Sequence, residues 1–225
     1  YTIINIIGLA LSLACTIILV RYIHRELQVN THCTDAENVY IPLRDIDGNV
    51  FPGSVGPDSG ADTVYFQPEA VKERSYFYNV TIDEKPYAVQ LLAADTAFFH
   101  FFNYPLKGKC MAAPEEALVT RQFAKRVFGE KDPIGKTMEY SGGKHLTICG
   151  ILDEPACKSS LTFDIVVNLD LKTRREWSRM YVELLRFMPG VDVDAINASS
   201  NVYRQTSQGF RIRYNFLPVS QLYWN

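Results

Sequence analysis

The feature that most constrains this 225-residue chain is an uncharged stretch near its beginning, residues 3–20. It reads IINIIGLALSLACTIILV, and its apolar side chains are interrupted only by Asn5, Gly8, Ser12 and Thr16. At about 1.5 Å of rise per residue, such a helix is just long enough to cross a hydrocarbon core of about 30 Å. Because a continuous helix satisfies its own backbone hydrogen bonds inside lipid, we predict a transmembrane helix.

Three other interpretations of this stretch are weaker. A secretory signal peptide has a shorter apolar core and a small-residue cleavage site, whereas this run continues into the helix-like RYIHREL of residues 21–27. A buried core helix is seldom this long, and a helix lying on the lipid surface needs a polar face that the run lacks. The small pairs Gly8/Ser12 and Ala10/Ala14 allow another helix to approach closely, so we expect partner helices outside this chain.

The charge balance limits the partners of the remaining residues. The chain carries 23 basic and 25 acidic residues, a net charge of −2, and no second apolar run of membrane length. The absence of a basic stripe that would displace counterions from phosphates argues against a nucleic-acid partner, and we predict none. Residues after about 30 should therefore form an ordinary water-soluble fold.

The cysteines do not settle the redox compartment. Cys15 lies in the predicted span, and the other four cysteines allow three disulfide pairings, which stay open: Cys33, Cys110, Cys149 and Cys157. Cys149 alternates within LTICGIL like a strand residue, so we expect it to be a small buried hydrophobe. His32 beside Cys33 is too little for a metal site, and we predict no metal and no cofactor.

The elements expected along the chain are of mixed type, which predicts the α+β class. In the first part we expect a helical stalk (21–28), a strand (38–43), a long loop (44–63), a helix (68–74) and two strands (75–82 and 87–92). In the middle we expect a short aromatic helix after Asp95, a strand (116–120), a helix from Thr120 to Gly129, a hairpin (138–152) and a strand (161–168). In the last part we expect a strand (180–187), a helix (192–204) and a strand (210–219).

Candidate chemistry is sparse, and we predict no catalytic residue. Residues 129–137, GEKDPIGKT, are similar to a phosphate-binding loop, but five residues separate Gly129 from Gly135 instead of four. A helix rather than a strand precedes them, and Pro133 removes one backbone donor, so we expect a surface turn. The four histidines, His24, His32, His100 and His145, are not spaced to present two ligands on one face. The aromatic run 98–104 could line a ligand groove, but core packing is the more ordinary role for such a cluster.

Several stretches of the sequence resemble one protein family. These are residues 5–27, residues 93–108 (AADTAFFHFFNYPLKG), residues 118–153 with their AKRVFG and DPIGK turns, and the following EPACKSSLTFD. Together they resemble the MacB-like, FtsX-related permease subunits of bacterial ABC transporters, in the form found in Bacteroidetes. The resemblance covers nearly the whole chain.

This resemblance implies a first transmembrane helix and stalk (1–30), followed by a periplasmic core domain. That domain would have a split porter-like part of βαβ character (31–92 and 172–225) and an inserted, mainly-β, sabre-like part (93–171). The resemblance also implies an inner-membrane protein whose residues after about 30 lie in the periplasm. It would be non-catalytic, with ATP hydrolysed by a separate ABC ATPase subunit. The full-length permease would form a homodimer, and a periplasmic adaptor or outer-membrane protein is a further candidate partner.

The function implied is transmission of ATP-driven conformational change through the stalk to the extracytoplasmic domain, for efflux or substrate handling. In that role the rigidity of the stalk helix should matter more than its side chains. The alternative is a single-span sensor or ligand-binding domain that uses the 44–63 loop for recognition. Further membrane spans in the same gene would favour the permease, and a kinase-like domain would favour the sensor. A membrane-tethered hydrolase is disfavoured because acid/base residues are not grouped.

Overall fold

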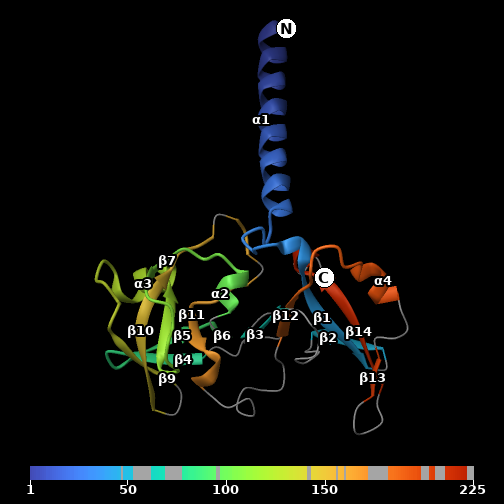
Figure 1. The fold of residues 1–225 in the computed structure, drawn as a ribbon. Coiled ribbons are helices and arrows are strands. Elements are labelled where there is room, and N and C mark those ends of the chain that lie inside the picture. Colours follow the sequence, from blue (N-terminus) through green and yellow to red (C-terminus); the bar gives the residue numbers. More distant parts are fainter. Residues whose placement is uncertain are drawn as a thin grey trace.

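The computed structural model describes residues 1–46, 48–52, 62–68, 78–94, 97–140, 143–155, 157–159, 161–171, 182–198, 203–205 and 211–221. They form one long helix, α1 (Thr2–Leu27), above a domain of strands and short helices (Figure 1). The short helices are α2 (Phe98–Phe101), α3 (Arg121–Phe128) and α4 (Val193–Ala198). This confirms the predicted α+β class.

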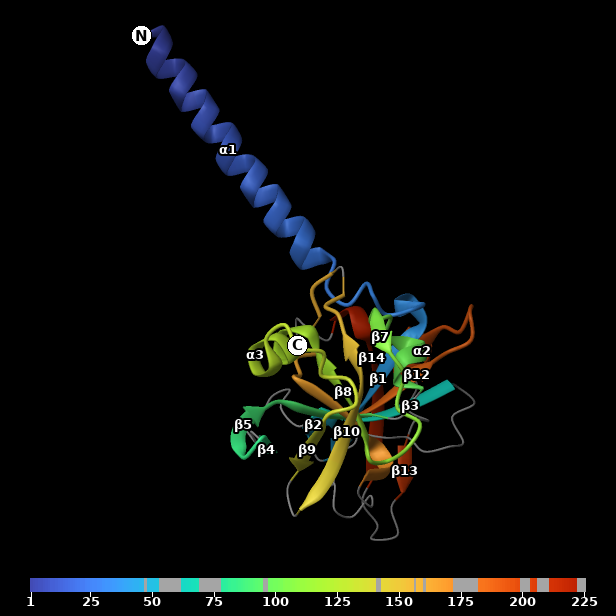
Figure 2. The ribbon, with the colours of Figure 1, turned by 90° about the vertical axis from the view of Figure 1, so that its left-hand side faces the viewer.

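Helix α1 runs without a break through the predicted span and most of the predicted stalk. No residue of it is buried, and an 18-residue window reaches a mean hydropathy of 2.6. In the described part of the chain it is the one helix long and apolar enough to cross a membrane. Figure 2 shows that α1 projects away from the domain and meets it only at its lower end. The stalk is therefore a direct continuation of the apolar helix.

The strands form one mixed sheet, in the order β13-β14-β1-β12-β3-β6-β11-β8-β10-β9-β4-β5, with β2 beside β1 and β7 beside β10. Only the β8–β10 and β6–β11 pairs among the described strands are parallel. The strand bounds are β1 (Val39–Ile46), β2 (Asn49–Pro52), β3 (Asp62–Pro68), β4 (Tyr78–Ile82), β5 (Lys85–Val89), β6 (Leu91–Ala94), β7 (Leu106–Gly108), β8 (Glu116–Thr120), β9 (Thr137–Tyr140), β10 (Lys144–Leu152), β11 (Ile165–Asn168), β12 (Val182–Arg186), β13 (Tyr203–Gln205) and β14 (Arg211–Pro218).

The sheet divides into two strand groups on either side of one pairing. The first strand group is β1, β2, β3, β12, β13 and β14, and the second strand group is β4 to β11; they lie side by side in Figure 1. The pairing between them is β3 with β6, from Phe66↔Ala94 to Pro68↔Leu92. The porter-like and sabre-like division stays a prediction. The pairing of β4 with β9, through Thr81 and Glu139, favours placing its first boundary between β3 and β4.

The central strands of the second group are buried on both faces, which is why they read as short apolar runs. In β6, β8 and β11 alternate side chains enter two different cores. Leu92, Leu118 and Val166 belong to one core, and their neighbours in the same strands belong to the other. The first core, here called the junction core, also contains Phe98 and Phe102 of the predicted aromatic run, both essentially inaccessible to solvent. The aromatic run is thus core, as predicted.

Helix α3 forms where its sequence signals predict it. The Thr120 side chain accepts a hydrogen bond from the backbone N–H of Phe123, which caps the first turn. Phe123 is fully buried and Phe128 nearly so, while Gly129 ends the helix with a φ of +62°. Asp132 then turns the chain by accepting from the N–H of Ile134 at 3.1 Å. Residues 129–137 are therefore the surface turn predicted, without a preceding strand.

The prediction of a long loop over residues 44–63 is wrong at both ends. Strand β1 continues to Ile46 and pairs with β2, and β3 begins at Asp62. The turn between β1 and β2 uses Gly48, whose φ of +84° suits glycine and whose N–H donates to the Asp45 carboxylate at 2.9 Å. The Asp-Gly pair in the sequence is a hairpin signal that the loop assignment overlooked. Residues 47 and 53–61 lie outside the described residues.

Other predicted bounds differ from the structure because strand pairing overrides local pattern. Of the helix predicted over 192–204, Val193–Ala198 is helical as α4, whereas Tyr203–Gln205 forms β13 against β14. The strand predicted over 87–92 divides at Gln90, because β5 pairs with β4 while β6 pairs with β3 and β11. Pro68, expected to open a helix, lies in β3 and pairs with Leu92, and 69–74 lie outside the described residues. The strand expected from 161 begins at Ile165.

The burial of the α3 face can be tested by truncation. Phe123→Ala should lower the free energy of unfolding by about 3–5 kcal/mol, since it empties a fully buried site. Phe128→Ala should cost less, because that ring lies at the margin of the core under Lys136. Lys125→Ala, on the exposed face of the same helix, is the control and should change stability by less than about 0.5 kcal/mol. Denaturant unfolding measures all three, and a neutral Phe123→Ala would contradict the assigned face.

Candidate functional site

The candidate site is the junction where α1 meets the domain. Immediately below the helix, Val29 and Asn30 are buried, after an exposed Leu27 and Gln28. Asn30 has a φ of +61°, in the left-handed region that asparagine tolerates better than most residues. This conformation, three residues after the end of α1, turns the chain into the domain.

Asn30 ties this turn to two distant parts of the chain. Its backbone N–H donates to the carbonyl of Lys158 at 2.8 Å, and its side-chain amide donates to the carbonyl of Val219 at 3.2 Å. Its own carbonyl accepts from the N–H of Cys33 at 2.9 Å. With a relative exposure of 1%, Asn30 is one of the few buried polar residues among those described. Because an unpaired buried amide would be costly, these bonds fix the turn.

An ion pair reinforces the junction from the side of the helix. The ammonium of Lys158 lies 2.8 and 2.9 Å from the two carboxylate oxygens of Glu26. The side chains are only 31% and 13% exposed, so solvent screens the pair less than an ordinary surface pair. Glu26, in the predicted stalk, thus makes a specific contact with the domain.

His32 forms the inner wall of the junction. Its Nδ1 lies 3.2 Å from the Cys157 sulfur, and its ring contacts Phe102 and Tyr104 at centroid distances of 5.3 and 5.0 Å. Burial lowers the pKa of His32 from 6.5 to about 4, because the charged imidazolium is poorly solvated there. The imidazole is therefore neutral at pH 7.

Backbone bonds join the next residues to the aromatic run. The N–H of Asn103 donates to the carbonyl of His32 at 3.0 Å, and that of Thr34 donates to Phe101 at 2.7 Å. Cys33 forms an isolated antiparallel bridge with Phe102 and is buried in the junction core. Burial raises the pKa of the Cys33 thiol to about 12, so it remains a neutral apolar group. The chain below α1 is thus built into the same core as both strand groups.

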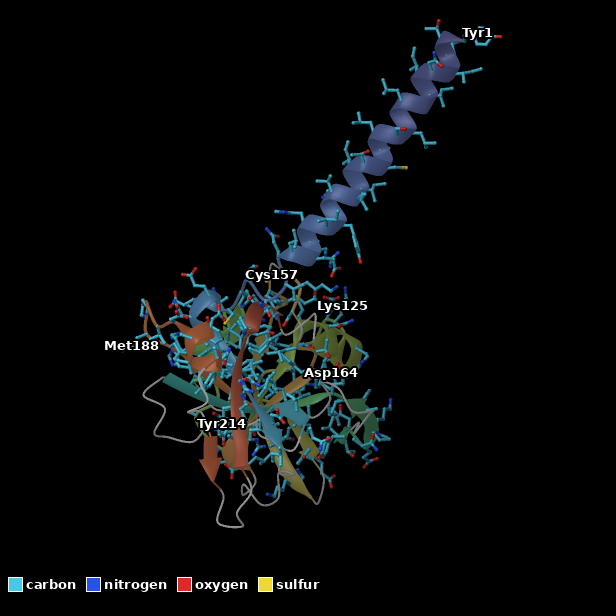
Figure 3. The ribbon with its side chains drawn as sticks, turned by 90° about the vertical axis from the view of Figure 1, so that its right-hand side faces the viewer. Tyr1, Lys125, Cys157, Asp164, Met188 and Tyr214 are labelled. Atoms are coloured by element: carbon cyan, nitrogen blue, oxygen red, sulfur yellow. The ribbon has the colours of Figure 1, made fainter. Side chains whose placement is uncertain are left out.

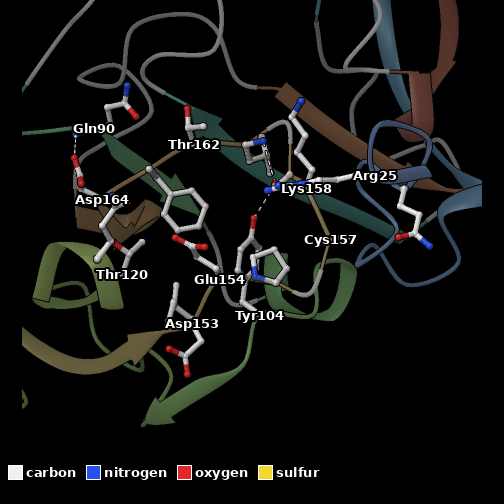
Figure 4. Close-up of a pocket in the computed structure, with 17 residues that line it drawn as sticks. Arg25, Gln90, Tyr104, Thr120, Asp153, Glu154, Cys157, Lys158, Thr162 and Asp164 are labelled. Carbon is white, nitrogen blue, oxygen red and sulfur yellow. Dashed lines mark hydrogen bonds between the residues drawn. The ribbon is translucent and has the colours of Figure 1, made fainter. Parts of the chain in front are cut away.

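A cavity of about 560 Å³ opens beside the junction, directly below the end of α1. Figure 3 places Cys157, one of its lining residues, beneath the lower end of the helix. Arg25 and Gln28 contribute from α1, and Tyr104, Lys158 and Phe163 are among the domain residues that line it (Figure 4). The hydroxyl of Tyr104 is hydrogen-bonded to that of Ser159 at 3.1 Å, and burial raises the pKa of Tyr104 to about 12. The cavity is therefore bounded by both the helix and the domain.

The junction combines an attachment of the helix to the domain with a cavity beside it. Within the described residues, no group of three or more His, Cys, Asp or Glu side chains could hold a metal. Of the histidines considered above, His32 lies inside the junction beside a cysteine and two aromatic rings, and His24 is hydrogen-bonded to Gln28 at the cavity. Cys149 is a buried residue whose thiol contacts the Ala117 carbonyl, as its strand position predicts. Asn30 and Lys158 carry no sequence signal, because their partners lie far away along the chain.

Comparison with known proteins places the chain in a recognisable group. A family model described as the MacB-like periplasmic core domain matches residues 2–201. No curated protein matches the sequence.

Three solved structures share the fold. A domain described as belonging to a permease protein from Porphyromonas gingivalis matches with a TM-score of 0.65 and 17% identity, over 83% of this chain and 92% of that one. The extracellular domain of the ABC-type transporter YknZ from Gram-positive bacteria matches with a TM-score of 0.51 and 12% identity, over 71% and 82%. The periplasmic region of MacB from Actinobacillus actinomycetemcomitans matches with a TM-score of 0.50 and 9% identity, over 72% and 80%.

The burial of His32 makes the stability of the domain depend on pH. Between pH 6.5 and about 4 the unfolded chain binds a proton at this residue that the folded chain does not. The free energy of unfolding should therefore fall as the pH is lowered through this range. His32→Gln should flatten that slope, whereas His145→Gln, on the exposed start of β10, should leave it unchanged. Urea melts at several pH values measure this, and parallel slopes for all three proteins would contradict it.

The Glu26–Lys158 pair should hold the junction closed. Glu26→Gln and Lys158→Met should each lower the opening free energy of the Asn30 and Cys33 amides. A double-mutant cycle should give a coupling of about 1–2 kcal/mol. The Lys107–Asp132 pair, 57% exposed on both sides, is the matched control and should couple by less than about 0.5 kcal/mol. Hydrogen exchange of the amides near each pair measures the two coupling energies. Equal values would show that the Glu26–Lys158 pair does not specifically hold the junction closed.

Proposed function

The chain belongs to the MacB-like periplasmic core domain family, and on this premise we propose that it transmits movement between a membrane and an extracytoplasmic domain. It would be the periplasmic domain of an ABC-type transporter permease, with α1 as a transmembrane helix in the inner membrane. ATP would be hydrolysed by a separate ABC ATPase subunit. The domain, residues after about 30, would rearrange in response, for efflux or substrate handling.

The observation that carries this proposal is the continuity of α1 with the junction. A helix transmits displacement along its axis when it is unbroken, and α1 is helical from Thr2 to Leu27. Within a few residues of its end the chain is attached by Glu26, Asn30 and Cys33 to segments around Lys158, Val219 and Phe102. A shift or tilt of the helix would therefore act on the domain directly rather than be absorbed by a flexible linker.

Partners beyond the ATPase follow from the same proposal. The exposed small-residue pairs of α1, Gly8/Ser12 and Ala10/Ala14, suit contact with further membrane helices. A homodimer of the full-length permease would place two such domains side by side. A periplasmic adaptor or outer-membrane protein would then take the substrate onward.

The single-span sensor is the second candidate, and the cavity beside the junction is the observation that favours it. A ligand in that cavity would touch both α1 and the domain, so its binding could alter their relative position. The 44–63 loop first suggested for recognition is partly strand, and 53–61 lie outside the described residues. The permease would transmit a change from the membrane to the domain, whereas the sensor would transmit one from the domain to the membrane.

Breaking α1 just above the junction tests the transmission proposal. In the full-length protein with its ATPase, His24→Pro should leave ATP turnover in place and abolish transport. Proline inside a helix costs about 3 kcal/mol and kinks it, which disconnects the domain from the membrane part. His24→Ala keeps the helix and should transport normally, since His24 is exposed and its ring is hydrogen-bonded to Gln28 of the same segment. Full transport by the proline variant, measured with ATP turnover in reconstituted membranes, would refute the lever.

A further inference from the structure

We propose that the cavity at the root of α1 binds a phosphate–ammonium zwitterion, the headgroup chemistry of phosphatidylethanolamine in the leaflet that faces the domain. The proposal requires α1 to cross the membrane, but it does not require coupling to an ATPase. It assigns a ligand class to a cavity of about 560 Å³, a volume typical of small-molecule sites.

The position of the cavity along α1 brings it to the headgroup layer. Val20 is the last residue of the uncharged run, and Arg25, which lines the cavity, lies five residues further on. Five helical residues extend about 7.5 Å. The headgroup layer on each side of a bilayer is about 5–7 Å thick. Arg25 therefore lies at the outer edge of the headgroups, where a lipid phosphate is within reach of its side chain.

The charges that line the cavity are of both signs and lie apart. Figure 4 shows Arg25 and Lys158 on one side, and Asp153 and Glu154 on the other. Asp164 is the fifth charged lining residue. An anion alone would meet three carboxylates, and a cation alone would meet two basic groups. A ligand that carries both charges matches both sides.

Most of these charged side chains already form ion pairs. The two that do not are the ones available to contact a ligand. Asp153 pairs with Arg121, Asp164 with Arg126, and Lys158 with Glu26. Within the described part of the chain, this leaves Arg25 and Glu154 as the lining charges without an ion pair.

Each of the two remaining charges suits one end of the zwitterion. A guanidinium binds two phosphate oxygens in parallel, so Arg25 suits the phosphate. A primary ammonium offers three N–H donors, so Glu154 suits the amine. Choline has no N–H to donate, and phosphatidylglycerol has no cation. Both should therefore bind less well than ethanolamine.

The reactivity of Cys157 reports occupancy of the cavity. Cys157 lines the cavity and is half-buried, whereas Cys110, also half-buried, does not line it. The 225-residue chain is placed in nanodiscs of phosphatidylglycerol alone, or of phosphatidylglycerol mixed with phosphatidylethanolamine or with phosphatidylcholine. Iodoacetamide alkylation of each cysteine is then followed by peptide mass spectrometry. Cys157 should react about tenfold more slowly in the ethanolamine discs, as expected for a site that is about ten parts occupied to one part free. Cys110 should react equally in all three.

Two variants and one added ligand complete the test. Arg25→Gln and Glu154→Gln each replace an exposed side chain, so the fold is retained, and each should remove the protection. Equal Cys157 rates in all three discs, or protection that survives both substitutions, would overturn the proposal. Free phosphoethanolamine added to phosphatidylglycerol discs distinguishes the source. Protection by it assigns a soluble ligand, and protection only by the lipid assigns the membrane.

Discussion

The attachment of α1 to the domain depends on the hydrogen bonds of one buried asparagine. Asn30 follows α1, adopts a left-handed conformation and is removed from water, so its polar groups require partners inside the protein. The carbonyls of Lys158 and Val219 accept from its backbone and side-chain N–H groups. Lys158 precedes β11 of the second strand group, and Val219 follows β14 of the first. A single residue thus attaches the helix to both groups, and it can do so only when both are in place.

The junction core extends this attachment into the sheet. It contains Cys33 from the chain below α1, Phe98 and Phe102 from the aromatic segment, and Leu184 from the first strand group. Because protein interiors are packed at crystal-like density, such a core shifts as a unit rather than deforming gradually. Among the described strands, the β3–β6 pairing is the one that joins the two strand groups within the sheet, and the junction core connects them as well. The same contacts therefore attach the helix to the domain and hold the two strand groups together.

Several elements that depend on local interactions could be predicted from the sequence. The helix from Thr120 to Gly129 and the turn after Gly129 depend on neighbours a few residues away and were predicted, whereas the equally local Asp-Gly turn between β1 and β2 was overlooked. The division of a predicted strand at Gln90 and the strand at Tyr203–Gln205 depend on strand partners elsewhere in the sheet. The contacts of the junction could not be predicted from the sequence, for the same reason. Glu26 and Lys158 are 132 residues apart, and Asn30 and Val219 are 189 apart, so no periodicity or motif connects them. The resemblance to a family could supply the domain type, but not which side chains attach the helix to it.

The two attachments of the helix are unequal, and this decides how a force along α1 is shared. Toward the second strand group there are a backbone hydrogen bond of 2.8 Å from Asn30 and a partly buried ion pair from Glu26, both to Lys158. Toward the first group, the chain below α1 continues into β1, the Asn30 amide donates to Val219 at 3.2 Å, and Arg186 of β12 donates to the Thr34 carbonyl at 3.4 Å. A pull on α1 would therefore reach the first group through the covalent chain and the second group through the noncovalent contacts at Lys158, which can be released. In a transporter, that asymmetry would convert an axial movement of one helix into a relative movement of two parts of the domain.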